Sequence, residues 1–149
     1  MPSIIPGYIY TLFASVIIGT LIISACGLTV TNVKREAEEQ QLSNIAEYVA
    51  VKSMELTSHA PANNLTSTVH LDIPPLIGNQ RYWIQIANDS SKAWVEAGFG
   101  ATALSSEQRV YVPADIMASG IYASGSGAKA FLQYNWNATG ASLTLYGGN

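Results

Sequence analysis

The stretch IIPGYIYTLFASVIIGTLIISACGLTVTNVKREAEEQ, from Ile4 to Gln40, joins two different kinds of sequence end to end. Its first thirty residues contain no Asp, Glu, Lys or Arg, and dense charge begins at Lys34-Arg35-Glu36. All of the 7 basic and 10 acidic residues of the 149-residue chain lie from Lys34 onward. The chain therefore consists of an uncharged apolar segment and a polar remainder.

The apolar segment contains enough large side chains to require burial. Burying each such side chain is worth roughly 1.5–3 kcal/mol, so leaving them all in water forgoes on the order of 20–45 kcal/mol. A small domain has about 5–15 kcal/mol of net stability in total. The side chains cover every side of a helix, which suits burial in lipid or among other helices. They are Ile4, Ile5, Tyr8, Ile9, Tyr10, Leu12, Phe13, Val16, Ile17, Ile18, Leu21, Ile22, Ile23, Leu28 and Val30.

An amphipathic helix is predicted to continue the apolar segment. After charged residues begin at Lys34, apolar or small residues recur at helical spacing and form a stripe along one side of the helix. Most charged residues lie outside this stripe. No proline occurs between Pro6 and Pro61, so one helix from about Gly7 to Thr57 is expected, ~75 Å long, ending near His59. The stripe consists of Leu42, Ile45, Ala46, Val49, Ser53 and Leu56.

The rest of the chain alternates polar and apolar residues between turn signals, which predicts strands. Residues 68–73 and 81–86, with the turn Gly78-Asn79 between them, are expected to form a hairpin. Further strands are expected over residues 92–99, 109–112, 121–123, 130–134 and 142–145. The fold class is therefore α+β: one long N-terminal helix followed by a small antiparallel β-rich head. The expected division is residues 1–60 for the helix, apolar over 4–33 and amphipathic over 34–58, and residues 61–149 for the head.

Several function classes are disfavoured by composition and motifs. A net charge of −3 with 11% charged residues argues against a nucleic-acid binder, which needs a basic face. The stretch 120–129 lacks the spacing of a phosphate loop and is interpreted as a flexible hairpin tip. His59 and His70 have no zinc-ligand spacing around them, and Ser124 and Ser126 fit no nucleophile motif. We expect no enzyme, no catalytic, metal or cofactor-binding residue, and for Cys26 a buried position.

Three N-glycosylation sequons lie in the polar remainder and none lies in the apolar segment. Each has its asparagine in an expected loop or turn, where a sugar would have access to solvent. If they are used, the head faces the outside of the cell. The acceptor residues are Asn64, Asn88 and Asn137.

Two alternatives compete for the apolar segment. The sequence Ile23-Ser24-Ala25-Cys26 matches the site at which bacterial lipoproteins are cut and lipidated, but no basic residue precedes Tyr8 as such a signal requires. A simple membrane anchor is the stronger alternative, with Lys34 and Arg35 flanking the span, although positive charge there favours an intracellular C-terminal part.

The organisation resembles a type IV pilin, specifically the archaeal branch of that superfamily. The resemblance covers nearly the whole chain: an apolar N-terminal segment, a long amphipathic helix and a small β head. The stretch VHLDIPPLIGNQRYWI, residues 69–84, is similar to the strand, proline, turn and aromatic strand that follow the helix in archaeal pilin-like proteins. Bacterial pilins carry glutamate at the fifth mature residue, where this chain has Ile5, and no basic leader precedes the segment. The sequence is accordingly taken as already processed, unless Gly7 closes a leader without basic residues.

The resemblance implies a structural subunit of an extracellular helical filament with a role in adhesion or surface attachment. Its partners would be further copies of the chain, the cytoplasmic membrane before assembly, and N-linked glycans, with no nucleic acid and no cofactor. An archaellin of a swimming filament and a monomeric membrane-anchored binding module remain alternatives, and a lipid-anchored enzyme is the least favoured alternative. The filament-core residues would be Ile4, Ile5, Ile9, Leu12, Phe13, Val16, Ile17, Ile18, Leu21, Ile22, Ile23 and Leu28.

Overall fold

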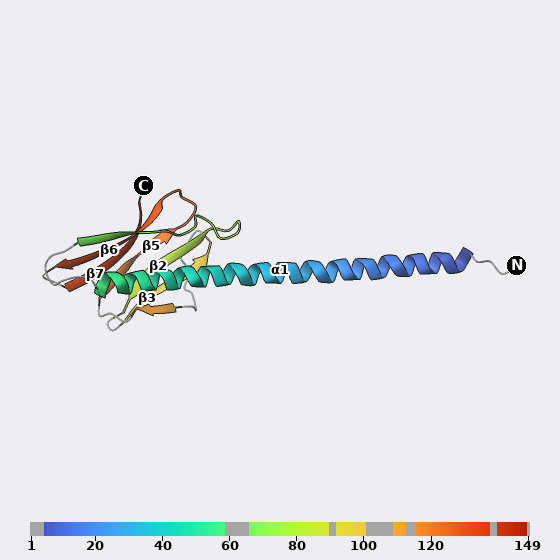
Figure 1. Ribbon diagram of the computed structural model, residues 1–149, viewed down its shortest axis with the longest axis horizontal. Coiled ribbons are helices and arrows are strands. Elements are labelled where there is room, and N and C mark those ends of the chain that lie inside the picture. The colour runs from blue at the N-terminus through green and yellow to red at the C-terminus, as the bar shows by residue number, and fades with distance from the viewer. Residues whose placement is uncertain are drawn as a thin grey trace. The chain divides into compact units, whose positions relative to one another are not determined.

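The structure, a computed structural model, describes residues 5–58, 66–89, 92–100, 109–112, 116–137 and 140–148, with the backbone alone at residues 5, 6 and 137. One long helix is followed by a seven-stranded, mostly antiparallel sheet (Figure 1). The predicted α+β class is therefore confirmed. By its internal contacts the chain forms two units, residues 1–37 and 38–149. The second half of the helix thus belongs with the sheet, whereas the sequence suggested a division after residue 60.

The helix α1 (Ile5–Ser58) is continuous, as expected from the absence of an interior proline. Pro6 lies in its first turn, where a missing N–H costs nothing because no intrahelical acceptor is available there. The helix ends one residue before His59, close to the predicted end. Hydroxyl groups help to close it, since Thr57 Oγ1 donates to the Met54 carbonyl at 2.9 Å and Ser58 Oγ to the Glu55 carbonyl at 3.0 Å.

The C-terminal part of α1 lies across one face of the sheet (Figure 1). The predicted stripe is buried at Leu42, Ile45, Ala46, Val49 and Ser53, and Leu56 is partly buried against the same core. The Ser53 hydroxyl is fully enclosed and donates to the Val49 carbonyl at 2.7 Å, which offsets the cost of burying it. Helical periodicity therefore predicted correctly which side of this half of the helix packs.

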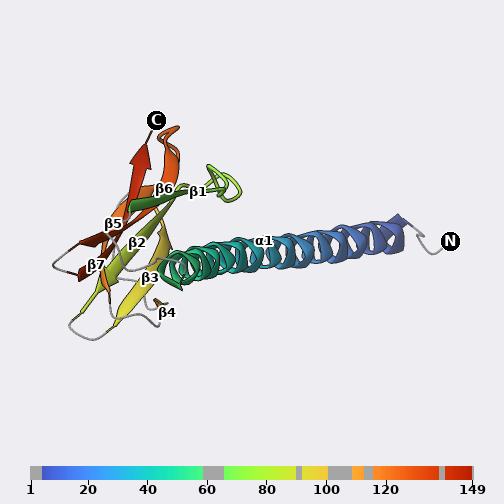
Figure 2. The same cartoon turned by 60° about the vertical axis from the view of Figure 1, so that its left-hand side comes forward.

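The sheet has the strand order β1-β6-β7-β5-β2-β3-β4, and its twist is visible in Figure 2. All neighbouring strands are antiparallel except β5 and β7, which are parallel. Every predicted strand is present, with shifted ends at all but one. The strands are β1 (Thr66–Leu71), β2 (Tyr82–Asn88), β3 (Ala93–Phe99), β4 (Arg109–Val112), β5 (Met117–Ala123), β6 (Lys129–Asn137) and β7 (Gly140–Gly148).

The predicted hairpin of residues 68–73 with 81–86 is wrong. β1 pairs with β6, and β2 pairs with β3 and β5, so the two strands are not neighbours. The Gly78-Asn79 turn does form, but it closes only an isolated bridge in which Ile77 and Gln80 exchange backbone hydrogen bonds of 3.2 and 3.0 Å. Ile77 is completely buried in the core, so this segment is held by side-chain packing and not by strand pairing.

The segment between β1 and β2 also contacts α1 where the compact unit begins. Gln80 Nε2 donates to Glu38 Oε2 at 3.1 Å. A Cβ at Gly78, whose φ is +59°, would come within 2.2 Å of Glu38 Oε1. Glycine is favoured here by the left-handed backbone, whereas the Glu38 carboxylate lies at the end of a flexible side chain that can move away from a Cβ.

The predicted hairpin tip at residues 120–129 is also corrected. β5 and β6 are not paired, because β7 lies between them and pairs with both. The turn Ser124–Ala128 therefore connects two strands across the end of a third. Tyr122 supports this connection, since its hydroxyl donates to the Ala128 carbonyl at 3.1 Å.

Tyr82 ties three parts of the head together. Its hydroxyl donates to the Pro74 carbonyl, and its backbone N–H donates to Ser124 Oγ at 2.8 Å, while Ser124 N–H returns a 2.8 Å bond to the Tyr82 carbonyl. Burial raises the pKa of the Tyr82 phenol, and the neighbouring Tyr122 adds to the effect. Burial raises the pKa of Tyr122 as well.

These shifts predict loss of stability at alkaline pH. The unfolded chain releases the Tyr82 proton near pH 10 while the folded chain retains it, so the folded state binds more protons and the free energy of unfolding falls as pH rises. We expect a fall of about 1.4 kcal/mol per pH unit from this group above pH ~10, measured by urea unfolding at stepped pH. Tyr82→Phe should remove this part of the slope, and an unchanged slope in that variant would contradict the assignment.

Candidate functional site: the apolar half of the helix

The first half of α1 presents its apolar side chains to the surroundings. Fourteen large apolar or aromatic side chains from Tyr8 to Val33 are each more than half exposed, from 51% at Ile9 to 76% at Tyr10. Among the predicted filament-core residues with described side chains, all ten are in this set. Ile4 lies outside the described residues, and only the backbone of Ile5 is described. No described part of the chain packs over the apolar side chains of this segment.

Every Ser and Thr hydroxyl group in this segment is satisfied by the helix itself. Each donates to a backbone carbonyl three or four residues earlier at 2.8–3.0 Å, so none depends on water. An environment without water would therefore leave none of these hydroxyls unpaired. Ser and Thr in an apolar helix commonly bond in this way. The residues are Thr11, Ser15, Thr20, Ser24, Thr29 and Thr31.

Small residues interrupt the bulky surface of the segment. A Cβ built at Gly19 or Gly27 would have no neighbour within 4 Å outside the helix backbone. Cys26 is exposed, in contrast to the buried position expected from sequence, because no described part of the single chain packs against this side of the helix. Small residues at these positions permit close approach of a second apolar helix.

The segment meets the requirements of a membrane span. By length and composition α1 is the one described helix able to cross a bilayer, and none of the residues in its apolar window is buried in the protein. From Gly7 to Val33 the helix rises ~40 Å, compared with a hydrocarbon core of ~30 Å. Membrane insertion is thus compatible with the structure.

Only one of the three predicted glycosylation sites has a described side chain. Asn88 and Asn137 are the last residues of β2 and β6, so their expected position in loops or turns is wrong, because strand pairing extends to them. The side chain of Asn88 is nevertheless exposed, and its amide nitrogen donates to the Asp89 carbonyl at 3.2 Å. Asn64 lies outside the described residues. Asn137 ends β6, and its backbone alone is described. The exposure of Asn88 is what attachment of a glycan requires.

We expect native material to carry a glycan at Asn88, as well as at Asn64 and Asn137. Asn88→Gln should lower the intact mass by one glycan, as measured by mass spectrometry of protein from the native host. Asn79→Gln is the matched control, because Asn79 is also exposed but begins no sequon. Unmodified peptides at all three acceptor positions would reject the prediction.

Three side chains of types that can take part in catalysis, Ser124, His70 and Glu96, form contacts within the head. Ser124 is buried and accepts the Tyr82 N–H, while His70 packs on Phe131 with ring centroids 5.4 Å apart. The buried carboxylate of Glu96 accepts the Trp94 indole N–H and lies 3.8 Å from Arg109 Nε. No group of three or more potential metal ligands occurs within the described residues, and His59 lies outside them.

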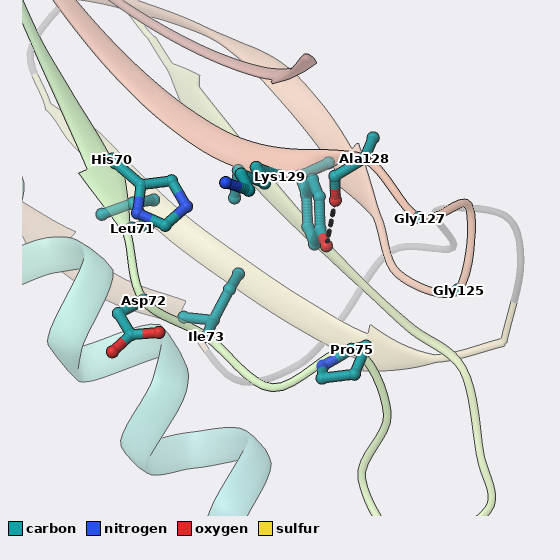
Figure 3. Close-up of a pocket in the computed structure, with 11 residues that line it drawn as sticks. His70, Leu71, Asp72, Ile73, Pro75, Gly125, Gly127, Ala128 and Lys129 are labelled. Atoms are coloured by element: carbon teal, nitrogen blue, oxygen red, sulfur yellow. Dashed lines mark hydrogen bonds between the residues drawn. The ribbon is translucent and has the colours of Figure 1, made fainter. Parts of the chain in front are cut away.

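The head also has a small open pocket, which sequence reasoning missed. It has a volume of about 240 Å³ and lies between the end of β1, the segment that follows it, and the connection from β5 to β6 (Figure 3). Ile73 and Tyr122 contribute apolar surface, and His70, Asp72 and Lys129 contribute polar groups. The lining residues come from two separate stretches of the sequence, residues 70–75 and 122–130, which is why no local motif indicated the pocket.

Comparison with known proteins found no match: no protein-family model, no curated protein and no solved structure is similar to this chain.

Proposed function

We propose that the protein is the structural subunit of an extracellular helical filament, an archaeal type IV pilus, which assembles through the apolar half of α1. The observation that carries the proposal is the continuous exposure of fourteen large apolar side chains in a helix that also continues into a folded head. Copies of the chain that bury this surface against one another would form a filament core with the heads outside. The proposed use is adhesion or attachment to surfaces.

The energetics favour burial between helices. At roughly 1.5–3 kcal/mol for each large side chain, enclosing the fourteen is worth on the order of 20–40 kcal/mol for each subunit, before losses of entropy. Because the apolar residues surround the helix, one neighbour cannot cover them all, and several neighbours are needed. A contact repeated by a rotation and a rise that do not close produces an open helical polymer.

Before assembly, the subunit is inserted in the membrane through the apolar half of α1. A bilayer encloses the same side chains, and the self-satisfied hydroxyls of the segment cost little there. Insertion in the cytoplasmic membrane followed by transfer into a filament keeps the apolar surface out of water at each stage. An archaellin would use the same helix in the same way.

A monomeric membrane-anchored module is the second candidate. It is favoured by one specific observation: the apolar part of α1 is close to the length of a single bilayer span and ends at Lys34-Arg35. Electron microscopy of material sheared from cells distinguishes the two. Filaments that contain the protein support the first candidate, and its recovery only in membranes supports the second.

We predict that molar salt leaves the filaments intact, while a detergent able to solvate apolar helices releases subunits. Salt at 1 M shortens the screening length to about 3 Å and weakens exposed charge pairs, which are worth about 0–1 kcal/mol each, but it does not weaken apolar contacts. Sedimentation of filaments after each treatment is the measurement. Filaments that dissolve in high salt without detergent would show that charged contacts carry the assembly.

A further inference from the structure

We propose that the pocket of Figure 3, together with a row of aromatic rings beside it, binds a neutral oligosaccharide. The binding site deepens the attachment role proposed above and rests on it for its biological use. Binding itself can be measured on the single chain, so it does not depend on whether filaments form.

The polar groups of the pocket are opposite in charge and unpaired. Asp72 and Lys129 both line it and both are exposed, yet neither side chain forms a hydrogen bond or ion pair with any described residue. A carboxylate accepts hydrogen bonds and an ammonium group donates them, so together they match hydroxyl groups, which do both. Their charges cancel, so the pocket has no net attraction for an anion or a cation. This charge balance is complementary to an uncharged ligand rich in hydroxyls.

The aromatic row gives the site a second element. His70 lines the pocket and packs on Phe131, and the Phe131 ring stacks with Tyr146 at 5.7 Å and 23° between the planes. That spacing is typical of offset stacking, in which part of each ring face remains open. Tyr146 is 37% exposed. Partly open ring faces provide the flat apolar surface that the C–H faces of a pyranose ring can cover.

Glycine at the end of β7 shapes this row. A Cβ at Gly148 would come within 3.1 Å of the Phe131 ring, so the ring lies close against the backbone of the strand. His70, Phe131 and Tyr146 come from three adjacent strands, β1, β6 and β7, in the register that pairs His70 with Phe131 and Phe131 with Tyr146. The row therefore extends from the pocket across the sheet, which indicates a ligand longer than one sugar unit. A free amino acid would satisfy the charges but would not reach the rings.

The test uses the full chain in a polyoxyethylene detergent, which has no sugar headgroup. Maltotetraose and cellotetraose, one α-linked and one β-linked neutral tetramer, are titrated by calorimetry, and glycine and acetate serve as charged probes. We expect at least one tetramer to bind and to shift the ring signals of Tyr146 in nuclear magnetic resonance spectra. Glycine or acetate binding as tightly as the better tetramer would overturn the assignment of ligand class, and no binding by either tetramer would overturn the site.

Matched variants locate the site. Asp72→Asn and Lys129→Met should each weaken tetramer binding about tenfold or more, as expected when a hydrogen bond to a charged group is lost. Lys92→Met removes another exposed lysine of the head outside the pocket and should leave the affinity unchanged. Equal affinities in all three variants would overturn the proposal. Filament formation by the same variants is examined by electron microscopy. A variant that forms normal filaments but has lost tetramer binding shows a role of the pocket in binding and leaves the filament proposal unaffected.

Discussion

Ile18→Asp is expected to abolish filaments while the protein remains in the membrane. The side chain lies near the centre of the apolar segment and is 57% exposed in the single chain. In a filament core the carboxylate would be enclosed without a partner, which costs several kcal/mol in each subunit. A loss of about 3 kcal/mol already corresponds to about a 100-fold weaker contact. Filament yield by electron microscopy and membrane-bound protein by immunoblot are measured together.

The two measurements separate the filament from the simple anchor. One charge at the centre of a membrane helix costs about 2.5–3.5 kcal/mol on insertion scales, which a segment with this many large apolar residues can absorb. Val51→Asp is the matched control, because Val51 is 55% exposed on the same helix but lies in the half that belongs to the head. Normal filament yield from Ile18→Asp would show that this segment is not the core of an assembly.

Gly120→Ala is expected to destabilise the head by about 3–5 kcal/mol, a large part of the ~5–15 kcal/mol available to a small domain. Gly120 has a φ of +125°, which side chains with a Cβ rarely adopt, and a Cβ there would lie 2.1 Å from the Leu145 carbonyl oxygen. Gly120 and Leu145 are register partners in the parallel pair β5 and β7. The variant would therefore force apart two central strands, as measured by urea unfolding followed through tryptophan fluorescence.

Gly140→Ala isolates the contact from the backbone strain. Gly140 has nearly the same φ, +128°, but a Cβ there would meet nothing within 4 Å. Its replacement should cost only the strain of the unusual φ, about 1–3 kcal/mol. Equal losses in the two variants would show that the close approach of β5 and β7 contributes nothing beyond backbone conformation.

Much of the fold could be predicted because burial leaves a periodic trace in the sequence. The charge switch at Lys34 and the absence of interior proline predicted the helix, and the stripe from Leu42 to Leu56 predicted its packed side. Alternation of polar and apolar residues located every strand, although β5 extends four residues before the expected 121–123 and β7 extends at both ends. Ends depend on pairing with neighbouring strands, which alternation does not record.

Among the candidate functional residues, the sequence identified the apolar segment and the exposed Asn88. It also suggested a buried Cys26, which is exposed in the single chain, because the apolar setting indicates burial without saying whether lipid or another helix provides it. The pocket was missed, since Asp72 and Lys129 are far apart in the sequence and meet only through the pairing of β1 with β6.

By itself, then, the sequence determined the long helix, its apolar and amphipathic halves, the strand-rich head and the α+β class. These are local properties, because a helix or strand records in its own periodicity which side avoids water. Only the tertiary structure decided that β1 pairs with β6, that β5 and β7 are parallel, and that the compact unit begins at Glu38. Such choices depend on how distant segments fit one another, as Gly120 fits Leu145 and Gly78 fits Glu38, and no local pattern encodes that fit.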